Sequence, residues 1–197
     1  MLSEKNKKLL AALFMLLLAS ISCIILVSSA KGCGCNSGNP QPEPSDKVFE
    51  DTAQNFIKLK SDLKQMVDKT IGSDSSSIIS KSMSMDPQKI LSCVKSKMKA
   101  NGMRSYSFNM SGDKLDAPII AMHETNPKIF SILSECDFLS LVGRVIAIAA
   151  WATNSSDKSK ENLIIFLSCI DRINWGSIDT WNDLSNGENS PVMKCMK

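Results

Sequence analysis

Hydrophobic and polar positions divide this chain into three parts. Residues 9–30 form an uncharged, predominantly apolar run, residues 31–45 are mostly polar, and residues 46–197 place apolar side chains largely at helical spacing. This pattern predicts an all-α fold: a single disulfide-stapled bundle of about five to seven helices behind an N-terminal signal or anchor helix.

Helix signals recur along residues 46–197. Asp86-Pro87 and Asn126-Pro127 each combine an N-cap residue with a proline at the first helical position. The predicted helices cover 46–71, 87–101, 118–124, the segment after Pro127, 137–152, 158–174 and a short stretch after Ser177. Residues 103–111 alternate polar and apolar side chains and predict one extended segment.

Two of these helices have informative faces. Asp137 is expected to cap the helix over 137–152, which is apolar nearly all round and therefore predicts a central, buried element. It is too short, at about 15 residues and with Arg144 inside it, for a second membrane span. The helix over 158–174 is expected to be amphipathic and to turn six apolar side chains inward. These are Leu163, Ile164, Phe166, Leu167, Ile170 and Ile173.

The apolar run over 9–30 indicates in which cellular compartment the rest of the chain is expected. As a helix it would be about 33 Å long, close to the roughly 30 Å hydrocarbon core of a bilayer. Three fates are open: cleavage as a signal peptide at the small residues 28–30, retention as a signal anchor, or lipid modification at Cys23 or Cys33. Lysines precede the run, so we expect the rest of the chain outside the cytoplasm, membrane-anchored or secreted.

Residues 31–45 contain glycine, proline, asparagine and serine at most positions. Such a segment cannot pack a core, and its three alternating prolines favour an extended backbone. We therefore predict a signal or anchor at 1–30, a spacer at 31–45 and a helical extracytoplasmic domain at 46–197.

Cysteines support this compartment. Setting aside Cys23 in the apolar run leaves an even set: Cys33, Cys35, Cys93, Cys136, Cys169 and Cys195. In an exported chain such a set predicts disulfides, with reduced buried thiols as the alternative. For the last four we favour Cys93–Cys195 with Cys136–Cys169. Cys33 and Cys35 would pair with each other or with a partner in trans.

Charge and chemistry exclude several classes of function. The chain has 23 basic and 20 acidic residues without a basic patch, so we expect no nucleic-acid partner. His123 is the only histidine, and neither paired carboxylates nor a metal-ligand spacing is evident. We expect no enzyme activity, no catalytic or metal-ligating residues and no cofactor.

Two further features bear on binding. Arg144 lies in an apolar helix and needs an anionic partner, for which Glu135, Asp137, Glu161 and Asp171 are the candidates. Trp175 and Trp181 would form an interface if exposed and part of the core if buried, and we favour the core.

By elimination, we predict a non-enzymatic surface protein that binds another macromolecule, a protein, outside the cytoplasm. Membrane attachment would run through residues 9–30 or a lipid. The alternative is a helical carrier of an apolar small molecule, with a cavity among four apolar residues on different predicted helices. These are Met98, Phe130, Ile146 and Phe166.

Overall fold

The computed structural model describes residues 46–72, 78–79, 83–103, 116–184 and 186–197, and all the regular secondary structure within them is helical. The α-helices are α2 (Asp46–Ile71), α4 (Pro87–Ala100), α5 (Asp116–Thr125), α6 (Pro127–Glu135), α7 (Phe138–Asn154), α8 (Lys160–Ile170), α9 (Ile178–Asp183) and α10 (Pro191–Lys194), with one 3-10 helix, η1 (Gly187–Asn189). The predicted all-α class is confirmed. The tail after Pro191, which gave no helical pattern, contains α10 and raises the number of helices above the expected range.

Local signals place most helix ends where the sequence predicted them. The Asp86 carboxylate accepts a hydrogen bond from the Gln88 amide at the start of α4, and the Asn126 side chain accepts one from Ile129 at the start of α6. Both caps satisfy backbone donors that the first turn leaves unpaired. Gly72 follows α2 with a positive φ of 101°, a conformation that glycine adopts without strain.

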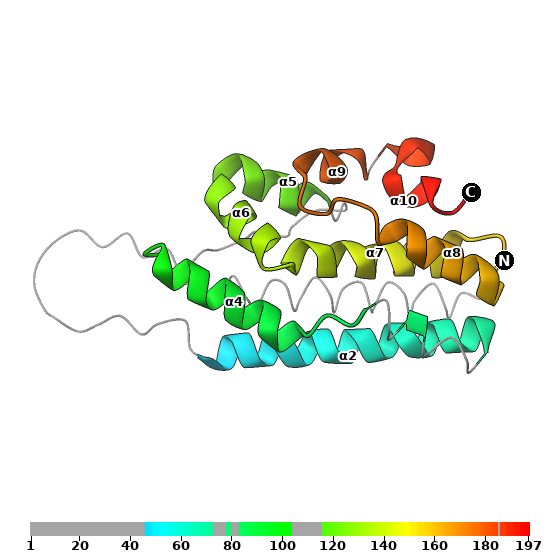
Figure 1. Ribbon diagram of the computed structural model, residues 1–197, viewed down its shortest axis with the longest axis horizontal. Helices are drawn as coiled ribbons and strands as arrows, with labels where there is room; N and C mark the ends of the chain where they lie inside the picture. Colours follow the sequence, from blue (N-terminus) through cyan, green and yellow to red (C-terminus); the bar gives the residue numbers. More distant parts are fainter. Residues whose placement is uncertain (1–45, 73–77, 80–82, 104–115, 185) are drawn as a thin grey trace, which may run out of the picture.

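Helix α7 is the centre of the core. It packs against α2, α4, α6 and α8, and in Figure 1 it runs between α2 on one side and α5, α9 and α10 on the other. Ten of its seventeen residues are buried, which confirms the predicted central helix. On the far side α5 packs against both α6 and α9, so the chain closes over α7.

A tight contact attaches the segment after α8 to α7. A Cβ atom on Gly143 would lie only 2.1 Å from Cε3 of Trp175, so the absence of a side chain on α7 makes room for the indole ring. Trp175 donates from its Nε1 to the Ile170 carbonyl, and Trp181 donates to the Trp175 carbonyl at 2.8 Å. Both indoles are therefore buried with their polar atoms paired.

Two disulfide bonds cross-link the helices, but not in the predicted pairing. Cys93 on α4 bonds to Cys136 directly after α6, and Cys169 on α8 bonds to Cys195 directly after α10. The prediction that these four cysteines form disulfides is confirmed, whereas the favoured pairing is wrong. The pairing depends on which helices lie beside each other in the fold. The spacing of the cysteines along the sequence does not give that arrangement.

Three further expectations need correction. Asp137 precedes α7 but its side chain caps nothing, because the residue adopts a left-handed backbone with a φ of 60°. Helix α8 ends at Ile170, earlier than predicted, where the chain turns toward Trp175. Ile164, expected to face inward, is 44% exposed.

Several predictions fall on parts of the chain outside the described residues. These are the apolar run at 9–30, the spacer at 31–45, the extended segment beyond Met103, and Cys23, Cys33 and Cys35. Among the helices of the described part, none combines the length and apolar character needed to cross a bilayer.

Candidate functional site

Helix α8 has one buried and one solvent-facing side, and both carry apolar residues. Leu163, Phe166, Leu167 and Ile170 are buried against the core. Ile165, by contrast, is 68% exposed and lies next to the 44% exposed Ile164. Ile57 on α2 is the third large apolar side chain exposed among the described residues. The adjacent isoleucines on α8 are therefore the strongest exposed apolar feature in the described part of the molecule.

A single outward stripe runs along this helix. Glu161, Ile165 and Ser168 follow one another on α8 at steps of four and three residues and share one helical face, and Arg172 follows four residues later in the turn directly after the helix. All four are exposed. The helical turn continues past Ile170, because the amides of Asp171 and Arg172 donate to the Leu167 and Cys169 carbonyls. We call these four residues the α8 stripe.

The stripe has an acidic end, an apolar and small centre, and a basic end. The Ser168 hydroxyl donates to the Ile164 carbonyl on its own helix, so the centre offers no unpaired hydroxyl donor. In the described part of the chain, neither Glu161 nor Arg172 makes an ion pair. Both charges are therefore available to a binding partner.

Three constraints hold α8 in place beneath the stripe. The Ser159 hydroxyl accepts a hydrogen bond from the Asn162 amide at the first turn. Near the other end, Cys169 is bonded to Cys195, and Asp171 pairs with Arg144 of α7 at 2.6 Å. Asp171 is thus the anionic partner of Arg144 among the four candidates, and this ion pair joins α7 to the end of α8. The exposed isoleucines are presented on a fixed support.

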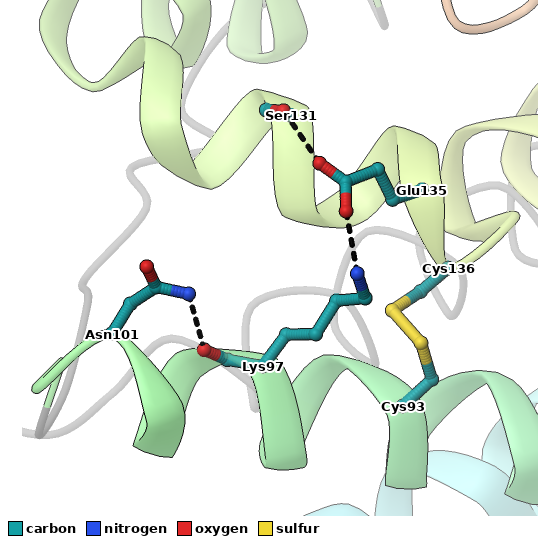
Figure 2. The surroundings of a disulfide bond; sticks show 6 residues. All are labelled: Cys93, Lys97, Asn101, Ser131, Glu135 and Cys136. Carbon is teal, nitrogen blue, oxygen red and sulfur yellow. Dashed lines mark hydrogen bonds and ion pairs between the residues drawn. A yellow bond between two sulfur atoms is a disulfide. The ribbon is translucent and has the colours of Figure 1, made fainter.

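A second fixed region joins α4 to α6. Figure 2 shows the Cys93–Cys136 bond beside an ion pair between Lys97 and Glu135. Lys97 donates a hydrogen bond to one Glu135 oxygen and Ser131 donates to the other at 2.9 Å. These hydrogen bonds, the one from Lys97 first, hold the pKa of Glu135 below its ordinary value of 4.5. This arrangement braces α4 against α6.

The predicted interface tryptophans do not reach the surface. Trp175 and Trp181 are 2% and 0% exposed, and their ring centroids lie 5.9 Å apart. They belong to the core, as predicted, and cannot form a binding patch. The sequence pattern left Ile165 off the inward face but placed Ile164 on it, and it did not single out the exposed side of this helix as a binding surface.

His123 and the four residues predicted to line a cavity occupy separate helices. His123 packs edge-on against Phe130 of α6, with ring centroids 4.8 Å apart. The Phe166 ring of α8 packs against Trp151 near the end of α7, at 6.1 Å. Met98 and Ile146 are partly buried against the same core. The carrier function therefore stays a prediction.

Within the described residues, no three histidine, cysteine or acidic side chains are grouped so that they could hold a metal ion. The fold and the stripe together define a disulfide-braced helical domain with one apolar, charge-flanked face on α8. Comparison with known protein-family models, curated proteins and solved structures finds no match to this chain.

Proposed function

We propose that this chain is a non-enzymatic interaction protein that acts outside the cytoplasm, tethered to a membrane or secreted, and binds another protein through the α8 stripe. The observation that carries the proposal is the exposed Ile165 of the stripe, with the exposed Ile164 next to it, on a helix that a disulfide and an ion pair hold in place. Exposed apolar side chains bordered by polar residues are typical of protein-binding surfaces.

The two disulfides support the proposed location outside the cytoplasm. Disulfides persist in oxidising environments and are rare in reducing cytosols. Both bridges join segments far apart in sequence, with separations of 43 and 26 residues. The lysine-headed apolar run at 9–30 supplies the matching route of export.

A site-specific photo-crosslinker tests the binding face. The probe replaces Ile165 in the full chain, and as a matched control it replaces Gln88, an exposed residue on α4. Irradiation of the cells that make the protein should yield a protein adduct from position 165 and none from position 88. No adduct, or equal adducts from both positions, would contradict the proposal.

Labelling with a thiol reagent tests the compartment. In protein taken directly from its source and unfolded without reductant, Cys93, Cys136, Cys169 and Cys195 should be unreactive, and they should react after reduction. Protease added to intact cells should also reach the helical domain. Free thiols at these four positions would place the native protein in a reducing compartment and overturn this half of the proposal.

A further inference from the structure

The order of side chains along the α8 stripe is self-complementary. If two α8 helices pack antiparallel around a two-fold axis, Glu161 of each copy lies opposite Arg172 of the other, and Ile165 lies opposite Ser168. A single register satisfies both pairings, because the centre of the stripe falls midway between each pair. A two-fold interface uses the same patch on both subunits and requires this kind of complementarity.

We infer that the protein bound by the α8 stripe is a second copy of this chain, docked antiparallel along α8. This inference rests on the proposed function and names its partner. In the dimer, two Glu161–Arg172 pairs flank a centre where the large Ile165 of one copy meets the small Ser168 of the other. Opposite charges at both ends fix the register, and the isoleucines supply the apolar contact.

The stripe is small for an interface between two copies. Stable interfaces between soluble proteins bury roughly 1,200–2,000 Å² in total. Glu161 and Arg172 lie only about 16 Å apart along the helix axis at about 1.5 Å per residue, so one stripe per copy covers less than that. A contact of this size gives weak association in solution. A tether to one membrane would raise the effective concentration of the copies, and weak self-association would then suffice.

Charge reversal tests the register. The full chain in detergent micelles should show concentration-dependent dimers by sedimentation equilibrium. Glu161→Arg places like charges opposite each other at both ends of the interface, and Arg172→Glu does the same. Each single change should weaken dimerisation about tenfold or more, because two attractive pairs become two repulsive pairs.

The double variant Glu161→Arg/Arg172→Glu reverses both ends at once and should restore dimerisation to near the wild-type level. Glu124→Arg, at an exposed position on α5, makes the same charge change away from α8 and should leave dimerisation unaltered. Circular dichroism should show an unchanged helical fold for all four variants, since every altered side chain is exposed.

The outcomes separate this inference from the proposed function. A wild-type chain that stays monomeric at all concentrations, or a double variant as weak as the singles, overturns the second-copy inference. If the crosslinker at position 165 captures a different protein, the interaction function stands and the second-copy inference fails. If it captures a chain of the same mass, both are supported, and if it captures nothing, both fail.

Discussion

Gly143 is the residue where a single added methyl group should damage the core most directly. Its Cβ would overlap the Trp175 ring, and neither the central helix nor the buried indole has room to retreat. We expect Gly143→Ala to lower the free energy of unfolding by about 2–3 kcal/mol, despite the better helix propensity of alanine. Urea-induced unfolding followed by circular dichroism measures this.

The control for this prediction is a double-mutant cycle with Trp175→Leu, which removes the ring that the methyl group meets. In that background, Gly143→Ala should cost less than about 1 kcal/mol. An equal loss in both backgrounds would show that the glycine serves the backbone of α7 rather than the approach of Trp175.

Asp137 shows a second effect at the scale of one residue. Its left-handed backbone, with a φ of 60°, is tolerated by aspartate and asparagine and disfavoured for β-branched side chains. Asp137→Asn should be nearly neutral, whereas Asp137→Val should lower the free energy of unfolding by about 1–2 kcal/mol. Thermal unfolding of both variants tests this, and equal melting temperatures would refute the argument from backbone strain.

At the scale of single residues, the sequence predicted those features that depend only on residues close by in the chain. The caps at Asp86 and Asn126 involve donors two and three residues away, so local pattern was sufficient. Gly143 and Trp175 are 32 positions apart, and their contact depends on how two helices and a turn fold together. The same limit explains Asp137: its residue type suits a cap, but the turn between α6 and α7 imposes a conformation in which it cannot act as one.

The brace between α4 and α6 gives an element-scale prediction with a defined pH dependence. The pKa of Glu135 is lowered in the folded protein, so its ion pair stabilises the fold above the ordinary value of 4.5 and is lost as pH falls through the folded value. Glu135→Gln should remove this component of the acid sensitivity. Urea midpoints measured from neutral pH down to about pH 3 should then fall less steeply than in the wild type.

Lys97→Met is the matched variant, because it removes the first and largest cause of the pKa shift and keeps Glu135 in place. It should flatten the same part of the pH profile. An acid profile identical to the wild type in both variants would show that this exposed ion pair contributes nothing measurable, as many surface pairs do.

Helix α8 shows why the existence of an element is easier to predict than the direction of its faces. Every position from Leu163 to Leu167 is apolar, so helical periodicity separates the inner from the outer side only in part: it left Ile165 off the inward face and wrongly placed Ile164 on it. Only the packing of α8 on α7 decides that Leu163 is buried and Ile165 exposed. The sequence therefore predicted the helix itself, but not that two adjacent isoleucines on it are exposed.

At the scale of the whole molecule, the two disulfides should stabilise the fold by slightly different amounts. On the chain-entropy model, the Cys93–Cys136 bridge contributes about 4 kcal/mol and the Cys169–Cys195 bridge about 3.5 kcal/mol. Replacing both cysteines of a bridge by alanine should lower the free energy of unfolding by amounts near these. Denaturant unfolding of each paired variant makes the comparison.

The two variants should also differ in where protection from hydrogen exchange is lost. Without the Cys169–Cys195 bridge, amides of α10 should exchange rapidly while those of α7 stay protected, because the bridge attaches only the final segment to α8. Without the Cys93–Cys136 bridge, the loss should extend to α4 and α6. Identical exchange patterns in the two variants would mean that the fold opens as one unit.

The close, tilted arrangement of the Trp175 and Trp181 rings provides an intrinsic optical reporter. Two indoles held 5.9 Å apart at an interplanar angle of 57° are close enough for their electronic transitions to couple. The resulting circular dichroism band depends on their mutual orientation and vanishes when the turn after α8 separates from α7. An experimenter can therefore follow the integrity of the support beneath the α8 stripe without attaching any label.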